Sequence, residues 1–287
     1  MPSDQTGAEK GFSLKRQLQA MLETLVKNGP GHAHEDGTPF FATPLLGVAA
    51  LDDPLFETFK QIIGAFHLTP VELLEKSFPT RSFNQGSVVV WVLPIHQQTR
   101  RSNRSETVWP SRAWTHTRQF GEAFNVTLRK QVTHFLAEQD GVAVAPQLSE
   151  HWLEVLSPKV GAASSWSERH AAYAAGLGTF SLNDGLITAR GIAHRIGSVV
   201  TDLVLEPDPR PYPDHLFNCL YHRNGSCGLC IERCPVGAIS VAGHDKVKCM
   251  EYVYGTVVRK LGSEYGVQTT GCGLCQTKVP CEAGIPK

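Results

Sequence analysis

Eight cysteines are the residues of this 287-residue chain whose type and spacing most clearly indicate chemistry. All of them fall in the last quarter of the chain, and the 218 residues before the first cysteine contain none. Because the chain shows no secretion signal, so dense a group of thiols indicates metal binding rather than disulfides. The cysteines are Cys219, Cys227, Cys230, Cys234, Cys249, Cys272, Cys275 and Cys281.

The spacing of Cys227, Cys230 and Cys234 favours iron–sulfur clusters over zinc. With Pro235 these residues read C-x2-C-x3-C-P, the end of the bacterial ferredoxin sequence that binds four-iron clusters. In ferredoxins with two clusters, the last cysteine of this run binds the other cluster, and eight cysteines satisfy two clusters. A zinc ribbon made from the two C-x2-C pairs is the alternative, but it leaves four cysteines at odd spacings.

Composition excludes several other classes of function. The chain has 27 basic and 27 acidic residues, so we expect no global electrostatic attraction to nucleic acid or to a membrane surface. The basic run Arg100–Arg104 is interpreted as a solvated loop rather than a phosphate-binding patch. No apolar run approaches the length of about 18 residues that a membrane span needs. We therefore predict a cytoplasmic protein with no membrane partner.

The residues before the cysteines predict a mixed α/β domain. Helical spacing of apolar residues and a capping box at Thr69–Glu72 predict several helices. The continuous β-branched run Ser87–Leu93 predicts a buried central strand, and residues 97–110 read as a polar loop. The main helices are expected at residues 12–26 and 55–66, from residue 70 onward, and at residues 114–137.

Four prolines between residues 206 and 213 mark the best domain boundary, because such a segment is stiff and unsuited to helix or sheet. We predict an α/β cofactor and substrate domain at residues 1–205, of which residues 1–80 are the helical N-terminal part. A connector at residues 206–215 then leads to a two-cluster domain at residues 216–287.

Two parts of the sequence match a known pattern when they are taken together. The first part begins with Ser167–Gly178, which contains E-R-x-x-A-x-x-A-G-L-G, and continues to T-D-L at Thr201–Leu203. The second part is the cysteine segment, with a single-cysteine stretch at Lys248–Tyr252 and a second motif at Gly271–Gln276. Over roughly residues 80–287, the chain resembles the epoxyqueuosine reductases and their relatives, the reductive dehalogenases.

The resemblance implies a fold class and a set of cofactors. In that family, a nitroreductase-like α/β domain precedes a bacterial-ferredoxin-like domain with two [4Fe-4S] clusters, and a corrinoid such as cobalamin binds over the α/β domain. It implies these ligand sets: for cluster 1, Cys219, Cys227, Cys230 and Cys281; for cluster 2, Cys234, Cys249, Cys272 and Cys275.

The matched segment also contains candidate cofactor-binding residues. Gly176, Leu177 and Gly178 would let the backbone approach a large flat ligand closely. A helix C-cap followed by a tight turn needs the same glycines, so both interpretations stay open. His170 and His194 lie in or near the same segment and are further candidates for the cofactor pocket.

Proton donors are harder to place. Members of the family carry an acidic proton donor near the start of the long helix, but residues 117–124 of this chain contain no aspartate. Glu122 is the nearest acid, although a glutamate on a helix surface is equally explained as a solvated side chain. His116 and Tyr173 are the other candidate proton donors.

These observations predict an enzyme, an iron–sulfur oxidoreductase that passes single electrons through two clusters to a cofactor and substrate in the α/β domain. A ferredoxin or flavodoxin would supply the electrons, and the substrate would be a small molecule or a modified nucleoside in tRNA. The alternative is a non-catalytic, ferredoxin-like electron carrier or redox sensor that has lost corrinoid binding, and the missing aspartate favours this alternative.

Overall fold

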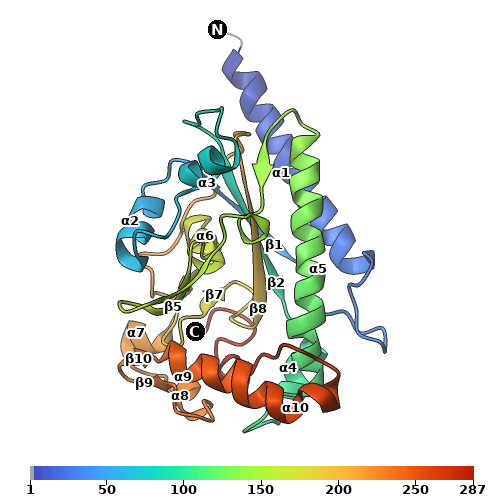
Figure 1. The fold of residues 1–287 in the computed structure, drawn as a ribbon, viewed down its shortest axis with the longest axis vertical. Helices are drawn as coiled ribbons and strands as arrows, with labels where there is room; N and C mark the ends of the chain where they lie inside the picture. Colours follow the sequence, from blue (N-terminus) through green and yellow to red (C-terminus); the bar gives the residue numbers. More distant parts are fainter. Residues whose placement is uncertain (1–2) are drawn as a thin grey trace.

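A four-stranded antiparallel sheet lies at the centre of the computed structural model, which describes residues 3–287. Helices cover both faces of this sheet, and the C-terminal segment lies across one of its ends (Figure 1). The chain therefore has the mixed α/β content that the sequence predicts. In spatial order the strands are β1 (Leu45–Ala50), β2 (Ser87–Pro94), β8 (His194–Thr201) and β3 (Ala143–Val144).

The central strand β2 is buried over its whole length, as its apolar sequence predicts. Because successive side chains of a strand point to opposite faces, Trp91 packs into one core and its neighbour Val90 into the other. The core that contains Trp91 is covered by α1 (Ser3–Asn28) and α5 (Arg112–Ala137). The core on the other face is covered by α2 (Leu55–Ile63), α3 (Pro70–Ser77) and α6 (Glu168–Ala174).

Two local predictions have opposite outcomes. The capping box is confirmed, because Thr69 Oγ1 accepts from the backbone N–H of Glu72 at 3.2 Å, and the Glu72 carboxylate accepts from that of Thr69 at 2.9 Å. The predicted loop at residues 97–110 is wrong in its first half, where helix α4 spans Gln97–Arg104.

The interpretation of Arg100–Arg104 as a solvated loop is also corrected. Arg100 Nη1 lies 3.3 Å and Arg104 Nε 2.7 Å from the carboxylate of Glu282, close to the C-terminal end. One face of α4 is therefore fixed by an acid that lies far away in the sequence.

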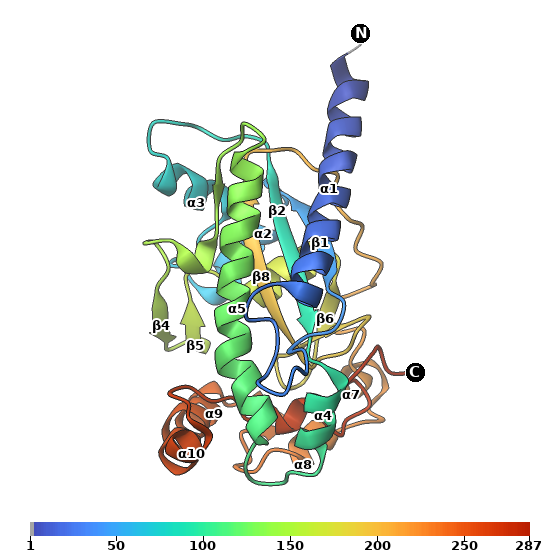
Figure 2. The same cartoon turned by 90° about the vertical axis from the view of Figure 1, so that its right-hand side faces the viewer.

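The cysteines lie in a C-terminal segment of short elements that packs against one end of the sheet (Figure 2). This segment contacts the α/β part through Asn218, whose side-chain amide donates to the Ile187 carbonyl oxygen at 2.9 Å. The ferredoxin-like fold of this segment stays a prediction. Its elements are α7 (Leu220–Asn224), α8 (Leu229–Glu232), β9 (Ile239–Ser240), β10 (Gly243–His244), α9 (Lys246–Met250), a π-helix (Glu251–Val257), α10 (Val258–Tyr265) and the 3₁₀ turn η3 (Leu274–Gln276).

The proline-rich connector is packed against the α/β part. Asp208 accepts from Lys15 Nζ at 2.7 Å and from the backbone N–H of Val48 at 2.8 Å, and Arg210 donates to the Ala174 carbonyl at 3.0 Å. The domain boundaries themselves stay a prediction. None of the described helices is long and apolar enough to cross a membrane. The remaining short elements are η1 (Pro146–Leu148), β4 (Glu154–Ser157), β5 (Gly161–Ser164), β6 (Gly178–Phe180) and β7 (Leu186–Thr188).

Candidate functional site

All eight cysteines are free thiols, and they divide into two sets of four around two cavities. One set lines a cavity of about 420 Å³, and the other lines a smaller cavity nearby. The division coincides with the two ligand sets that the resemblance implies. The large cavity has Cys234, Cys249, Cys272 and Cys275, and the smaller has Cys219, Cys227, Cys230 and Cys281.

Burial affects the protonation of the thiols in both sets. Burial raises the pKa values of Cys272 and Cys281 to about 12, so metal binding would have to displace their protons. The backbone N–H of Ala238 donates to Cys234 Sγ at 3.1 Å, the kind of contact that tunes a cluster's potential. Among the described residues, no group of three or more His, Cys, Asp or Glu is arranged to hold one metal ion.

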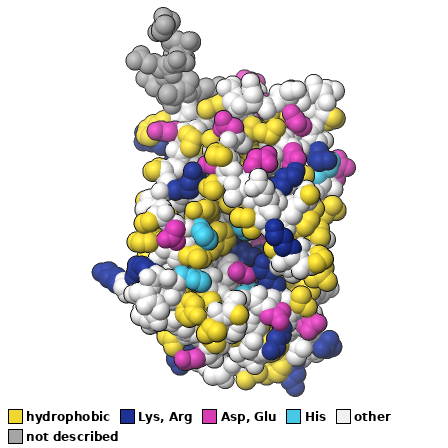
Figure 3. Space-filling model, turned by 90° about the vertical axis from the view of Figure 1, so that its left-hand side faces the viewer, with side chains coloured by type: hydrophobic (Ala, Val, Ile, Leu, Met, Phe, Trp, Pro, Cys, Tyr) yellow, Lys and Arg dark blue, Asp and Glu magenta, His cyan; other side chains and the backbone are white. Residues whose placement is uncertain are grey.

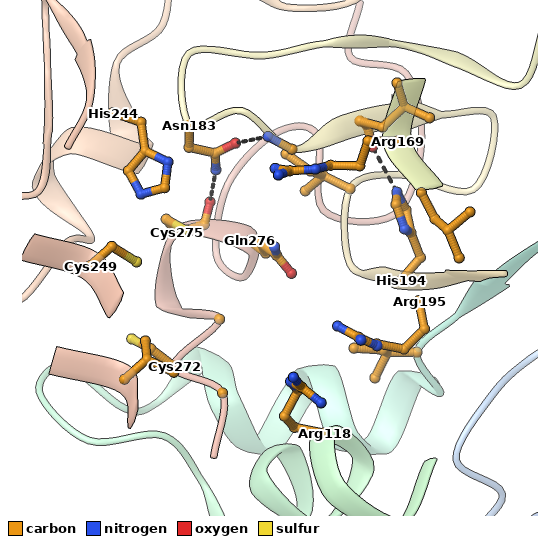
Figure 4. Close-up of a pocket in the computed structure, with 18 of the residues that line it drawn as sticks. Arg118, Arg169, Asn183, His194, Arg195, His244, Cys249, Cys272, Cys275 and Gln276 are labelled. Atoms are coloured by element: carbon orange, nitrogen blue, oxygen red, sulfur yellow. Dashed lines mark hydrogen bonds between the residues drawn. The ribbon is translucent and has the colours of Figure 1, made fainter. Parts of the chain in front are cut away.

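The large cavity lies between the sheet and the cysteine segment (Figure 4). Trp114 and Arg118 reach it from the first turns of α5, and His194 and Arg195 from the start of β8. Arg169 reaches it from α6, on the opposite side from the cysteines in Figure 4. The face of the molecule in Figure 3 is hollowed near its middle, with basic and histidine side chains at the hollow.

Arg195 is held in place by a buried carboxylate. Glu122 Oε2 lies 2.7 Å from Arg195 Nε, and Glu122 Oε1 lies 2.8 Å from Arg129 Nη1. Burial alone would raise the pKa of Glu122, but the two guanidinium groups outweigh burial and lower this pKa to about 2. Glu122 is therefore ionised and ion-paired, which corrects its interpretation as a solvated residue and favours a positioning role over proton donation.

Of the two candidate histidines, His194 lines the cavity and His170 does not. His194 Nε2 lies 2.8 Å from the Leu186 carbonyl oxygen, so this nitrogen carries the proton. His170 Nδ1 lies 2.8 Å from Ser167 Oγ. Burial lowers the pKa of His194 to about 4 and that of His170 to about 3, so both rings are neutral at neutral pH.

The other two candidate proton donors also lie outside the cavity lining. His116 Nε2 lies 2.7 Å from the Tyr265 carbonyl oxygen, which ties α5 to the end of α10. The ring of Tyr173 packs against Phe180, with 5.7 Å between ring centroids. These contacts explain both side chains structurally, and their catalytic roles stay untested predictions.

The glycines of Gly176-Leu177-Gly178 support chain packing, which favours the C-cap interpretation over cofactor contact. Gly176 adopts a φ of 72°, and a Cβ there would collide with the Pro209 carbonyl of the connector. A Cβ on Gly178 would collide with the Ile187 carbonyl. None of these three residues belongs to the described lining of the large cavity.

Several lining residues were missed by sequence reasoning, namely Trp114, Arg118, Trp166, Arg169 and Arg195. Only Arg169 carried a signal, because it lies in the motif that begins at Ser167. The other four lie on elements or loops whose orientation toward the cavity depends on the tertiary fold.

Comparisons with known proteins identify relatives of part of the chain. Over 124 residues the chain is 30% identical to an epoxyqueuosine reductase from Bacillus anthracis and 29% identical to one from Bacillus cereus. The predicted resemblance to epoxyqueuosine reductases is confirmed. The match covers 42% of this chain and only 30% of the Bacillus anthracis protein, so the chain spans under a third of that relative. No protein-family model matches the chain.

A comparison with solved structures matches the chain to reductive dehalogenases and epoxyqueuosine reductases at low sequence identity. A catabolic reductive dehalogenase is 16% identical, with a TM-score of 0.50 over 84% of this chain and 30% of its own. An epoxyqueuosine reductase is 18% identical, with a TM-score of 0.49 over 96% of this chain and 67% of its own. At such identities the dehalogenase comparison supports the fold and nothing finer.

Proposed function

We propose that this protein is an iron–sulfur reductase in which two [4Fe-4S] clusters feed single electrons to a reaction in the large cavity. The observation that carries the proposal is that two different parts of the chain line opposite walls of that cavity. One wall holds four free cysteines, and the other holds the arginines and His194 of the α/β part. An electron donor at one wall and a substrate at the other would be in the same cavity.

The chain's own residues have distinct parts in this proposal. Cys234, Cys249, Cys272 and Cys275 would hold the cluster next to the cavity, and the other four cysteines would hold the outer cluster. Bound clusters would supply one-electron transfer. The indole rings of Trp114 and Trp166 would exclude water from the substrate, and Glu122 would keep Arg195 in position.

Cobalamin is the cofactor that the resemblance implies for the space above the α/β part. The cavity of about 420 Å³ also includes the space beside the four cysteines that the proposed cluster would fill, and a corrinoid is larger than a drug-sized ligand, so it would extend beyond this cavity. Gly176 and Gly178, which would contact a corrinoid, are not among the described lining residues of this cavity. The fit is therefore incomplete, and the proposed reaction does not depend on a corrinoid.

The incomplete fit favours a second candidate function, a ferredoxin-like electron carrier or redox sensor without a corrinoid. In either case a ferredoxin or flavodoxin would be the electron partner. A small molecule or a modified tRNA nucleoside would be the substrate of the reductase. The zero net charge of the chain disfavours general tRNA binding.

The test is anaerobic purification followed by analysis of iron, sulfide and cobalt, with and without added cobalamin. The proposal expects about eight irons and a similar amount of sulfide per chain. Stoichiometric zinc without sulfide would contradict it. Turnover of a substrate distinguishes the reductase from the carrier, and a cobalamin titration followed by absorption determines whether a corrinoid takes part.

A further inference from the structure

Basic side chains gather around the buried carboxylate of Glu282, the residue that follows the last cysteine. Arg100 Nη1 lies 3.3 Å and Arg104 Nε 2.7 Å from this carboxylate, which also accepts from the backbone N–H of Lys278 at 2.8 Å. The Glu282 side chain is buried, whereas Arg104 and Lys278 are exposed. Helix α4 and the C-terminal segment thus meet at Glu282 and carry cations to the surface there (Figure 2).

The loop before β8 brings another cation to the same region. The backbone N–H of Ile192 donates to the Cys281 carbonyl oxygen at 2.9 Å, and a Cβ on Gly191 would collide with the Glu282 carbonyl. Arg190, the preceding residue, is exposed. The loop that carries Arg190 is therefore packed against the last cysteine and against Glu282.

The positive charges in this region are close enough to act on one another. Burial lowers the pKa of Arg100, and the nearby charges of Arg104, Arg190 and Arg101 lower it further. Arg101 is exposed on α4, as Arg104 is. We call this group the basic face, and its members are Arg100, Arg101, Arg104, Arg190 and Lys278.

The basic face has little compensating negative charge. Glu282 is the one acid among the described residues that affects the pKa of Arg100 or of Arg104. Five cations around one carboxylate form a local positive excess in a chain whose net charge is zero. No member of the basic face belongs to the described lining of either cysteine cavity, so these cations are separate from the cysteine ligands. A surface of this kind raises the local concentration of an acidic partner.

The basic face adjoins the smaller cysteine cavity. Cys281 lines that cavity together with Pro280, which is exposed, and Ile285 close by in the chain is 38% exposed. Weak electron-transfer complexes have small interfaces, and complementary charge speeds their formation. A carrier bound at the basic face would lie next to the set of cysteines proposed to hold the outer cluster.

We propose that the basic face is the docking surface for an electron carrier protein with an acidic surface. The carrier would transfer one electron to the outer cluster, so that its own redox centre is oxidised and the cluster is reduced, with no bond made or broken. The inference rests on the proposed function, because it names the surface at which the electron donor of that reductase binds.

The test measures, by stopped-flow absorption, how fast a reduced plant-type [2Fe-2S] ferredoxin, an acidic carrier, reduces the anaerobically purified, iron-loaded protein. The second-order rate constant should fall as ionic strength rises, because salt screens the attraction between opposite charges. At low ionic strength the double variant Arg101→Gln/Arg190→Gln should lower this rate constant by at least about tenfold, the lower end of the effect of electrostatic steering.

The controls separate docking from damage to the clusters. Arg16→Gln/Lys76→Gln is the matched variant, since it removes the same charge from exposed positions on α1 and α3 and should leave the rate constant unchanged. Reduction by the methyl viologen radical, a small cation, should be no slower in either double variant. Slower reduction of Arg101→Gln/Arg190→Gln by both ferredoxin and viologen would place the effect at the cluster and overturn the docking assignment.

Calorimetric titration with oxidised ferredoxin at low ionic strength distinguishes this inference from the proposed function. Full iron content, with binding and reduction rates that are the same in the original protein and in Arg101→Gln/Arg190→Gln, overturns the inference and leaves the reductase intact. Ferredoxin binding that this variant weakens, in protein that takes up no iron, supports the docking surface and contradicts the reductase.

Nucleic acid is the other macromolecule that a basic surface could bind. Titration of both double variants with tRNA tests this alternative. If Arg101→Gln/Arg190→Gln weakens tRNA binding but leaves the reaction with ferredoxin unchanged, the basic face binds nucleic acid, and the docking assignment is overturned.

Discussion

The carboxylate of Glu122 holds Arg195 at the cavity wall through one oxygen, which lies 2.7 Å from Nε and 2.6 Å from Nη2. Its other oxygen accepts from the buried Arg129 at 2.8 Å. Glu122 thus forms ion pairs both with Arg129 in the core and with Arg195 in the candidate site. Removing its charge would leave two guanidinium groups without their closest counter-charge.

The variant Glu122→Gln is therefore expected to lower the free energy of unfolding by about 3 kcal/mol, the usual cost of breaking a buried ion pair from one side. Urea unfolding at neutral pH measures this change. Glu138→Gln is the matched control, because Glu138 is exposed at the end of the same helix and should change stability by less than about 0.5 kcal/mol. A folded Glu122→Gln protein with no turnover but unchanged substrate affinity would instead support proton donation by Glu122.

The same ion pair predicts how stability depends on pH. The pKa of Glu122 falls from 4.5 to about 2 on folding, so its stabilisation is complete above pH 4.5 and is lost as pH falls toward 2. His170 and His194 affect stability at higher pH. Their pKa values fall from 6.5 to about 3 and about 4 on folding, so below pH 6.5 the unfolded chain binds protons that the folded protein does not, and the folded protein loses stability. Unfolding free energies measured from pH 7 to pH 2 should therefore decline in two stages.

Glu122→Gln should reduce the lower stage by about 3 kcal/mol and retain the upper one, while Glu72 and Asp184, whose pKa values are also lowered, keep their share of it. Identical profiles for the variant and the original protein below pH 4.5 would contradict this account.

The structure shows which parts of the fold the sequence could reveal. Ser87–Leu93 is an unbroken apolar run, and such a run has few places in a fold other than a central strand. The capping box at Thr69 is a local signal between residues three apart, so no distant partner was needed to recognise it. The spacing of Cys227, Cys230 and Cys234 is also a local signal, whereas the assignment of all eight cysteines to two sets came from the family resemblance.

What the sequence could not reveal depends on pairs far apart in the chain. Helix α4 reads as a polar loop until Glu282, 178 residues away, is seen against Arg104. Arg118 and Arg195 are ordinary basic residues until α5 and β8 bring them to one cavity. Glu122 reads as a surface acid until Arg195, 73 residues away, is placed beside it.

The role of Gly176 can be tested without any cofactor. Its φ of 72° and the nearby Pro209 carbonyl both oppose a side chain, so Gly176→Ala should destabilise the protein by more than about 2 kcal/mol. Gly31→Ala is the matched control, because Gly31 has a φ of 74° with nothing within 4 Å of the added Cβ. Its cost should be about 1 kcal/mol, from the backbone conformation alone. Equal costs at the two positions, measured by urea unfolding, would show that packing against the connector contributes nothing.

The division of the cysteines predicts how iron content responds to single substitutions. Cys272→Ser and Cys227→Ser should each remove the cluster of their own set, which leaves about four of eight irons. Iron and sulfide analysis after anaerobic purification measures this change, and paramagnetic resonance of the reduced proteins should show a different single cluster in each variant. Loss of all iron from both variants, in protein that is still folded, would indicate one shared site.

Glu282 provides the last prediction, because it fixes the C-terminal segment that carries Cys281. Its carboxylate accepts from Arg104 Nε at 2.7 Å and from the backbone N–H of Lys278 at 2.8 Å, and it lies 3.3 Å from Arg100. Only 3% of this side chain is exposed, so solvent screens these contacts weakly. Glu282→Gln should therefore loosen the segment and speed the release of iron from the outer cluster.

The rate of iron transfer to a chelator under anaerobic conditions measures this effect, and an increase of at least about tenfold is expected for the loss of a buried charged contact. Glu264→Gln is the matched control, since Glu264 is exposed on α10. Only the irons bound by the set that contains Cys281 should be released faster. Faster release from the set that contains Cys272, or an equal effect in the control, would show that the anchor at Glu282 does not act on the outer cluster.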